Sequence, residues 1–162
     1  MKQNLSSSSE GGELILKNVK TSDMLDLFKW RNHPAVRKNS FNTKPILYAE
    51  HKKWFREKVK DQKCVMYVAY CTGKKIGSIR FENGKEGVKT SVILNPDYWG
   101  KGFGSRLIRL ATEKFASENK PDKPIIAEIK KDNIASIKAF KKAGFKESHV
   151  TFVFNLNRRI CD

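Results

Sequence analysis

The sequence predicts a mixed α/β (α+β) domain with a largely antiparallel central sheet and helices on both of its faces. Three apolar segments of strand length lie within 65–94, and they are separated by Thr72-Gly73 and Asn83-Gly84, which are typical of turns between antiparallel strands. Apolar side chains then recur at helical intervals over 102–119. Strand and helix patterns alternate along the chain without an internal repeat, which also indicates this fold class.

The other elements follow from apolar periodicity and from residues that begin or end helices. The predicted strands are 13–19, 65–70, 76–81, 88–94, 125–129 and 150–156. The predicted helices run from Thr21 or Ser22 to Trp30 and over 46–59, 102–119 and 133–143. Pro34 and the polar run 38–45 predict a loop between the first two helices. The element order is therefore β-α-α-β-β-β-α-β-α-β.

Length and composition predict one domain. The chain has 162 residues, of which 39% are hydrophobic, so residues 13–162 can build a single core. The polar, Ser-rich stretch 1–12 is expected to be a flexible tail. No apolar run approaches the ~20 residues that span a bilayer, and we expect a cytoplasmic protein without a membrane partner.

The spacing of cysteine and histidine does not predict a metal site. Cys64, Cys71 and Cys161 form no CxxC pair, and the three histidines lie far apart in the sequence. We therefore expect reduced thiols and no bound metal.

The chain is strongly basic, with 33 Lys and Arg against 17 Asp and Glu and a net charge of +16. Such an excess favours an anionic partner, either nucleic acid or a phosphorylated small ligand. The basic residues are spread along the chain rather than gathered in one arm, which disfavours nucleic acid. Charge alone does not choose between the two.

A glycine-rich turn joins a predicted strand to a predicted helix. Gly100, Gly102 and Gly104 lack Cβ atoms, so backbone N–H groups there can converge on an anion. The helix that begins at this point adds unpaired N–H groups and the positive end of its dipole. Lys101 and Arg106 add full charges. The segment predicts a diphosphate site, and it matches neither the GxxxxGK[ST] P-loop nor the GxGxxG dinucleotide fingerprint.

A second segment, from Asn133 to Phe145, has a helix pattern that starts at an Asn and ends in Gly-Phe. Together with 99–104, this segment resembles the GCN5-related N-acetyltransferase (GNAT) family, whose signatures are [QR]xxGxG[AG] after a strand and an Asn-started helix ending in Gly-Phe. The resemblance extends over 13–157, since the predicted element order is similar to that of the family. It implies an enzyme that moves an acetyl group from acetyl-CoA, its co-substrate, to a primary amine.

The resemblance also implies which residues hold acetyl-CoA. The backbone of Ile93 and Leu94 would pair with the pantetheine arm, and Asn133 would reach the pantetheine or the thioester. The pyrophosphate loop would comprise Trp99, Gly100, Lys101, Gly102, Phe103, Gly104 and Ser105. Two positions depart from the family, because Trp99 replaces the usual Arg or Gln and Phe140 replaces a Tyr that protonates the departing thiolate. Water, Ser136 or the pantetheine environment is then a candidate source of that proton, and the alternative is a thiolate that leaves unassisted.

Acetyl transfer requires a neutral amine, whereas a lysine-like amine has a pKa of ~10.4. Glu128 is the first candidate for the general base, because it lies in the apolar strand pattern 125–129 and precedes Asn133 by five residues. The ribosomal-protein N-terminal acetyltransferase branch of the family places a glutamate at the equivalent point. Glu82, at the end of a strand pattern, is the second candidate. Positioning of amine and thioester is expected to lower the barrier by ~7–11 kcal/mol, which exceeds the help from a base.

The family builds its acceptor pocket from the first two helices and their loop, which correspond to 28–55 here. This segment resembles the branch that acetylates nucleotide-linked amino sugars in surface-glycan synthesis, such as the 4-amino sugar step of the pseudaminic acid pathway. A UDP-amino sugar brings a second diphosphate and a flat base. The candidate contacts are Arg31, Arg37 and Arg80 for the diphosphate, Trp30 and Trp54 for stacking, and His51 for the sugar or for proton transfer. Asn42 is a further candidate acceptor-binding residue.

Other acceptors and functions stay open. A protein N-terminal amine or a lysine is the alternative acceptor, but relatives that acetylate peptides usually need an acidic groove, whereas this chain is basic. A polycationic aminoglycoside is disfavoured for the same reason. A catalytically silent acetyl-CoA-binding domain and a basic nucleic-acid-binding module are the non-enzyme alternatives. The apolar segment 150–156 is compatible with a homodimer contact and equally with an interior strand.

Overall fold

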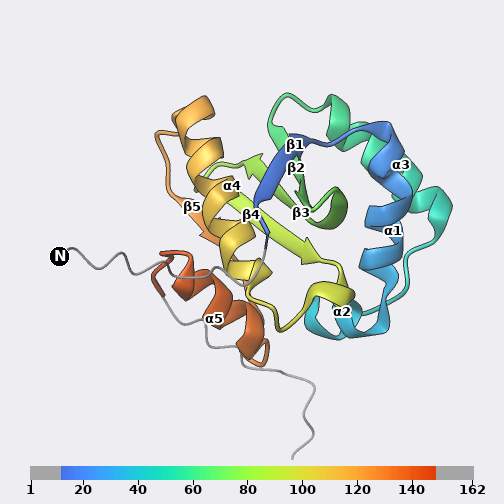
Figure 1. The fold of residues 1–162 in the computed structure, drawn as a ribbon. Coiled ribbons are helices and arrows are strands. Elements are labelled where there is room, and N and C mark those ends of the chain that lie inside the picture. Colours follow the sequence, from blue (N-terminus) through green and yellow to red (C-terminus); the bar gives the residue numbers. More distant parts are fainter. Residues whose placement is uncertain (1–11, 149–162) are drawn as a thin grey trace, which may run out of the picture.

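The computed structural model describes residues 12–148, which fold around one twisted sheet (Figure 1). The strands are β1 (Leu14–Asn18), β2 (Cys64–Cys71), β3 (Lys74–Asn83), β4 (Val88–Leu94) and β5 (Ile125–Ala127), and they lie in this order across the sheet. Strands β1 to β4 pair antiparallel, whereas β5 is parallel to β4. The predicted α+β fold with a largely antiparallel sheet is confirmed. Most of the predicted tail, the predicted strand 150–156 and Cys161 lie outside the described residues.

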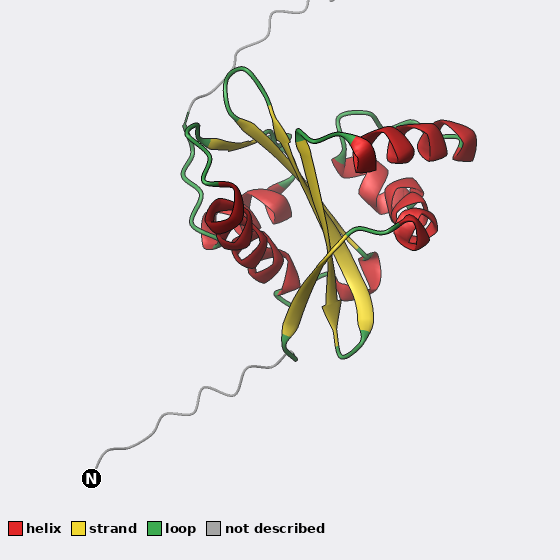
Figure 2. Cartoon of the chain, turned by 90° about the horizontal axis from the view of Figure 1, so that it is seen from above, coloured by secondary structure: helices red, strands yellow, loops and turns green. Residues whose placement is uncertain are grey.

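Helices cover both faces of the sheet (Figure 2). On one face lie α1 (Met24–Asn32) and α3 (Tyr48–Lys60), and α2 (Pro34–Asn39) follows α1. On the other face lie α4 (Phe103–Asn119) and α5 (Ile134–Lys142). Alternation along β2 supplies both cores, because Met66 and Val68 pack with α1 and α3 while Tyr67 and Ala69 belong to the core beneath α4.

The β2–β3 hairpin turns as the sequence predicts. Thr72 (φ 47°) and Gly73 (φ 78°) both adopt left-handed backbone, which is the geometry of a two-residue type I′ turn. Strand β3 then runs back beside β2, with one register shift at Ala69 and Tyr70. The hairpin places β3 between β2 and β4, at the centre of the sheet.

The loop predicted from Pro34 onward is wrong over 34–39, because this segment forms α2. Proline at the first helical position loses no hydrogen bond, and its fixed φ already suits a helix. The His33 side chain also accepts a hydrogen bond from the Ala35 N–H at 3.3 Å, which caps the helix start. A 3-10 turn, Thr21–Asp23, likewise precedes α1, and another, Pro96–Tyr98, precedes the glycine-rich turn.

Strands β4 and β5 separate soon after they meet. Only Val88–Thr90 of β4 pairs with β5, so 91–94 has no strand neighbour on that side in the part of the chain that the structure describes. The predicted strand 125–129 is too long, because β5 ends at Ala127 and Asn133 already caps α5. Glu128 therefore follows the strand instead of lying within it.

Candidate functional site

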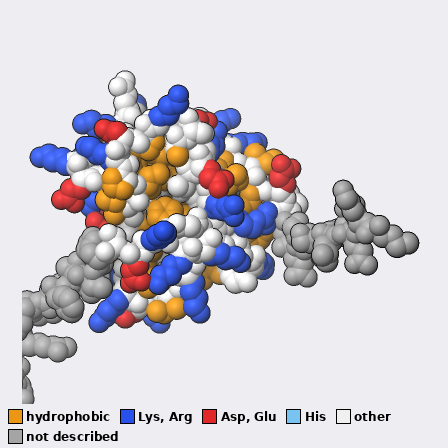
Figure 3. Space-filling model, turned by 90° about the vertical axis from the view of Figure 1, so that its left-hand side faces the viewer, with side chains coloured by type: hydrophobic (Ala, Val, Ile, Leu, Met, Phe, Trp, Pro, Cys, Tyr) orange, Lys and Arg blue, Asp and Glu red, His pale blue; other side chains and the backbone are white. Residues whose placement is uncertain are grey.

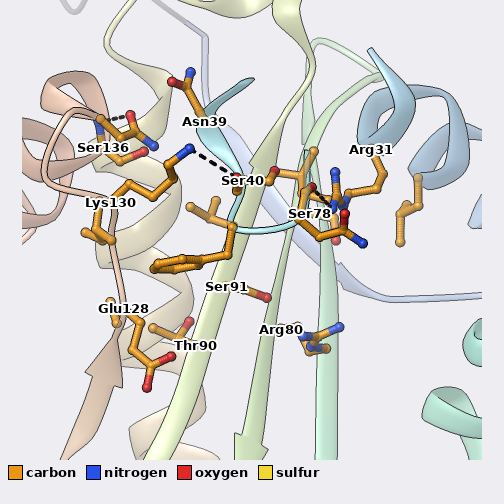
Figure 4. Close-up of a pocket in the computed structure, with 18 of the residues that line it drawn as sticks. Arg31, Asn39, Ser40, Ser78, Arg80, Thr90, Ser91, Glu128, Lys130 and Ser136 are labelled. Carbon is orange, nitrogen blue, oxygen red and sulfur yellow. Dashed lines mark hydrogen bonds between the residues drawn. The ribbon is translucent and has the colours of Figure 1, made fainter. Parts of the chain in front are cut away.

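A cavity of about 610 Å³ lies where β4 and β5 separate (Figure 4). Its wall combines residues from both faces of the sheet. Trp54 and Ile93 pack with the core beneath α1 and α3, whereas Ala127 and Phe140 pack with the core beneath α4. The cavity therefore passes through the gap in the sheet, and two ligands that approach from opposite faces can meet in it.

Many of the predicted site residues meet in this cavity. Its lining includes Arg31, Asn42, His51, Arg80, Ile93, Glu128, Asn133, Ser136 and Phe140. Leu94, Glu82 and the glycine-rich turn 99–105 lie outside the lining. The sequence prediction missed Ser78, Thr90, Ser91 and Lys130, which also line it. No pattern singles these four out, because small polar residues are common in strands and Lys130 is one of 33 basic residues.

The glycine-rich turn has the geometry of an anion site. Gly100 (φ 73°) and Gly102 (φ 77°) adopt left-handed backbone, and no described atom lies within 4 Å of a Cβ added at either position. Gly102 is the N-cap of α4, so the unpaired N–H groups of the first helical turn face an open approach. Phe103 anchors the helix start, since it is buried and packs edge-on against Tyr98 at 5.7 Å.

The longer side chains of this turn hold the loop in place. The Trp99 Nε1–H donates to the Leu94 carbonyl at 2.9 Å, which ties the turn to the end of β4. The Lys101 ammonium donates to the Asp97 carbonyl at 2.8 Å. The Ser105 hydroxyl donates to the Gly102 carbonyl at 3.3 Å. Backbone N–H groups are thus the donors that this turn offers to a ligand.

Helix α5 forms the wall of the cavity next to β5, and its ends match the predicted signature. The Asn133 Oδ1 accepts from the Ser136 N–H at 3.2 Å and so caps the helix. At the other end Gly144 is left-handed (φ 101°), and the Phe145 N–H donates to the Phe140 carbonyl at 3.0 Å. Phe140 is buried and packs edge-on against the Phe145 ring at 5.0 Å, so this position contributes a hydrophobic wall and no hydroxyl.

The two candidate carboxylates lie in different places. Glu128 lines the cavity, but its side chain is 60% exposed and pairs with the Lys89 ammonium at 2.9 Å. Glu82 belongs to β3, and its carboxylate contacts the Lys58 ammonium and, at 2.8 Å, Arg80 Nε. The contact with Arg80 is a charge pair without hydrogen-bond alignment. Glu82 is thus paired with two cations and does not itself line the cavity.

His51 is buried among aromatic rings of α1 and α3 and lines the cavity. Its Nε2 lies 3.1 Å from the Met24 carbonyl, which only accepts, so Nε2 carries the proton. Burial lowers the pKa of His51, and the bond to Met24 offsets this only in part. The ring is therefore neutral at pH 7, with Nδ1 as its acceptor. Trp30, by contrast, is a buried core residue outside the cavity lining, and the expectation that it stacks on a ligand has no support.

Two arginines lie at the end of the cavity near α2: Arg31 lines the cavity, and Arg37 of α2 lies close enough for its charge to act on Arg31. Arg31 Nη2 donates to the Asn42 carbonyl at 2.8 Å, while Arg31 Nη1 is buried and lacks a hydrogen-bond partner among the described residues. Arg37 donates to the carbonyls of Asn32 and Thr43. Burial lowers the pKa of Arg31, and the charge of Arg37 lowers it further.

Lys130 connects the two walls of the cavity (Figure 4). It follows β5, and its ammonium donates to the carbonyls of Lys38 at 3.1 Å and Ser40 at 3.4 Å, at the end of α2. On the side of β3, the Arg80 guanidinium lies over the Trp54 ring at 5.1 Å, which presents a flat, charged surface to the cavity. The end near α2 and α3 is thus rich in cations.

The described residues show no arrangement suited to a metal ion or to a membrane span. Over 12–148, His, Cys, Asp and Glu side chains nowhere gather in groups of three or more that could hold a metal. None of the helices in this range combines the length and the apolar character that crossing a membrane requires.

Sequence comparison identifies related proteins. Residues 13–146 match the family described as acetyltransferase (GNAT) domain. The uncharacterized protein MJ1062 of Methanocaldococcus jannaschii is 26% identical over 144 residues, which are 86% of this chain and 29% of that protein. The chain thus spans less than a third of the length of this relative.

Solved structures share the fold. A domain from Methanocaldococcus jannaschii superposes with a TM-score of 0.73 at 23% identity, over 84% of this chain and 90% of that one. Spermidine N-acetyltransferase from Vibrio cholerae, in complex with CoA and spermine, gives 0.74 at 19% identity over 88% of each chain. An aminoglycoside acetyltransferase in complex with coenzyme A gives 0.71 at 18%, over 84% of this chain and 86% of that one. Because the family match spans most of the sequence, the chain belongs to the acetyltransferase (GNAT) family.

Proposed function

We propose that the protein acetylates the amino group of a nucleotide-linked amino sugar, such as a UDP-amino sugar. The observation that carries this proposal is the group of cations Arg31, Arg37 and Lys130. In the described part of the chain these three donate to backbone carbonyls and have no carboxylate partner. A diphosphate would supply the missing negative charge, since guanidinium groups bind phosphate oxygens through paired hydrogen bonds.

Arg31 gives the most specific support. Leaving its buried Nη1–H unpaired costs roughly 1–3 kcal/mol or more for a charged group. An anionic oxygen in the cavity would remove that cost, and it would also relieve the repulsion between Arg31 and Arg37 that lowers the pKa of Arg31. A polyamine or an aminoglycoside would instead add positive charge beside these cations.

We propose that acetyl-CoA binds along the glycine-rich turn and in the gap between β4 and β5. Acetyl-CoA supplies the acetyl group as a thioester. Backbone N–H groups of 100–105 would hold the diphosphate, and the unpaired side of β4 over 91–94 would bind the pantetheine arm. Asn133 and Ser136 line the cavity where this arm would end. These residues would align the thioester with an amine bound near Arg31, and alignment of this kind supplies most of the rate gain.

Two side chains of the cavity are candidates to take the proton from the attacking amine. Glu128 is our proposed base, acting through a water molecule because its side chain is exposed and paired with Lys89. His51 is the other candidate, since it is neutral and its Nδ1 is an acceptor. Glu82 does not line the cavity, and we do not propose it as the base.

The test is a thiol-release assay with acetyl-CoA and a panel of acceptors. The panel contains UDP-amino sugars, the same amino sugars without the nucleotide, ribosomal N-terminal peptides, spermidine and aminoglycosides. We expect release of thiol with one or more UDP-amino sugars and much weaker release with the free sugars, because the latter lack the diphosphate. Turnover of only peptides or only polycations would overturn the proposed acceptor.

Arg31→Gln sharpens this test. The variant should raise KM for the UDP-amino sugar by about 10- to 100-fold, as expected for the loss of a charged hydrogen-bond donor, and should leave KM for acetyl-CoA within about twofold. Arg109→Gln is the matched control, since Arg109 is exposed on α4 and pairs with Glu113. An equal rise of KM in both variants would show that net charge, not the site, governs binding.

A further inference from the structure

Thr90 presents a buried hydroxyl that no described residue binds. Its side chain is 7% exposed, its Oγ1 lacks a hydrogen-bond partner in 12–148, and it lines the cavity. A buried hydroxyl without a partner lowers stability, and valine would fill the same space without that cost. A ligand group that accepts a hydrogen bond therefore explains Thr90 better than the packing of the core does.

The position of Thr90 indicates which ligand group this is. Thr90 pairs with Ala127 at the last paired position before β4 and β5 separate. Val88 and Val92 of β4 pack with the core beneath α4, so alternation along the strand directs Thr90 to the same face. Figure 4 shows Thr90 between β4 and the segment that carries Glu128. The hydroxyl thus lies at the inner end of the gap that we assign to the pantetheine arm.

Phe140 lies on the same face of the sheet and lines the same cavity. Its ring offers no hydrogen bond to a sulfur atom that gains negative charge. Ser136, the hydroxyl residue of α5 in the lining, lies in the first turn of the helix and is only partly buried. Among the hydroxyl groups of 12–148 that line the cavity, that of Thr90 is therefore the one that is buried without a hydrogen-bond partner.

We propose that the Thr90 hydroxyl donates a hydrogen bond to the coenzyme sulfur as the bond from sulfur to the acetyl carbon breaks. The inference rests on the acetyl-CoA chemistry of the family and not on the amino-sugar acceptor. It makes Thr90 a catalytic residue, because the hydroxyl would touch a reacting atom. Its contribution is largest once sulfur carries the full charge, which favours the products of the step.

The step balances without a strong acid. The lone pair of the acceptor nitrogen forms the C–N bond, and the electron pair of the C–S bond stays on sulfur. The proton that nitrogen loses passes to the base and then to solvent, and sulfur takes a proton from solvent afterwards. Thr90 keeps its own proton throughout, so its high intrinsic pKa is no obstacle.

The test compares binding of CoA with binding of desulfo-CoA, which lacks the sulfur, in the absence of any acceptor. A hydrogen bond to sulfur favours the thiolate, so the bound thiol should have a lower pKa than free CoA when thiolate absorbance is followed against pH. Thr90→Val should return this pKa toward the free value and weaken the binding of CoA thiolate by about tenfold or more. Binding of desulfo-CoA should change less than about twofold, and Thr90→Ser should retain most of the wild-type behaviour.

Thr112→Val is the matched control, because Thr112 on α4 also has a buried Oγ1 without a described partner but lies outside the cavity lining. It should leave the ratio of CoA to desulfo-CoA affinity unchanged. Thr90→Val should also raise the melting temperature of the free protein, which separates lost binding from lost folding. Equal effects on both ligands, or an effect found in Ser136→Ala instead, would overturn the role of Thr90. If UDP-amino sugars fail as acceptors, the comparison of CoA with desulfo-CoA is not affected, because it uses no acceptor.

Discussion

Arg31 and Thr90 each carry a buried polar atom that the described protein does not satisfy. Such atoms are rare, because buried N–H and O–H groups are nearly always paired in folded proteins. Asp23 shows the usual situation, since this buried carboxylate accepts from the Lys20 N–H at 2.7 Å and lies 2.7 Å from the Lys75 ammonium. Arg31 lies at the end of the cavity near α2, and Thr90 lies on the side of the sheet that faces α4. Both sides of the cavity therefore present an unsatisfied polar atom that a ligand can bind.

The proton acceptor can also be identified at the scale of single residues. Glu128→Gln is expected to lower kcat by roughly 10²- to 10⁴-fold at pH 7 if Glu128 is the base, and by less at alkaline pH, where free amine accumulates. Burial lowers the pKa of His51, so the ring takes up a proton only at a lower pH than a free histidine does. If His51 is the base, protonation of its ring causes an additional loss of activity on acidification, and this loss begins only below its ordinary pKa of about 6.5. The pH–rate profiles of Glu128→Gln and His51→Gln distinguish the two candidate bases. The variant that retains the true base should keep the shape of the wild-type profile, and the variant that lacks it should not.

At the scale of elements, the start of α4 depends on backbone conformation rather than on side chains. Gly102 has φ 77° and Gly73, in the β2–β3 turn, has φ 78°, and an added Cβ meets no described atom within 4 Å at either place. Gly102→Glu and Gly73→Glu should therefore each cost about 1–2 kcal/mol of stability through left-handed strain.

Only Gly102→Glu should also abolish the rise in melting temperature that acetyl-CoA causes, because its carboxylate would lie against the phosphates. Thermal unfolding of both variants with and without acetyl-CoA gives the comparison. A ligand-induced shift that survives in Gly102→Glu would remove the turn from the binding site.

At the scale of the whole molecule, the net charge of +16 acts as a field rather than as one contact. Figure 3 shows Lys and Arg spread over one face and mixed with Asp and Glu, not gathered into a stripe. This distribution suits attraction of a small anion to the cavity more than the tracking of a nucleic-acid backbone.

The field predicts a dependence on salt. With acetyl-CoA saturating, kcat/KM for a UDP-amino sugar should fall by about tenfold or more when ionic strength rises from about 0.01 to 0.15 M, because the screening length shrinks from about 30 to about 8 Å. The same amino sugar without its nucleotide should show little change. A parallel fall for both would mean that salt acts on the enzyme and not on attraction of the acceptor.

Prediction from sequence succeeded where the signal is local. The Thr72-Gly73 turn, the glycines before α4 and the cap at Asn133 depend on a few neighbouring residues, and the structure has each of them. The loop predicted over 34–39 was wrong, because Pro34 has the same chain neighbours whether it starts a helix or a turn. The end of β5 was misplaced, since the length of an edge strand depends on its partner β4.

Over the described residues, the sequence by itself determined the order of the elements apart from α2, together with the glycine-rich turn and the family, because periodicity, turn chemistry and helix caps are local properties of the chain. Only the tertiary structure decided what the cavity contains. Its decisive groups come from segments far apart in sequence, such as Arg31 against Asn42, Lys130 against Ser40 and Thr90 against Ala127. The contacts between these segments determine which polar atoms find a hydrogen-bond partner and which stay available to a ligand. Such contacts depend on distances between segments far apart in sequence, and local patterns carry no information about those distances.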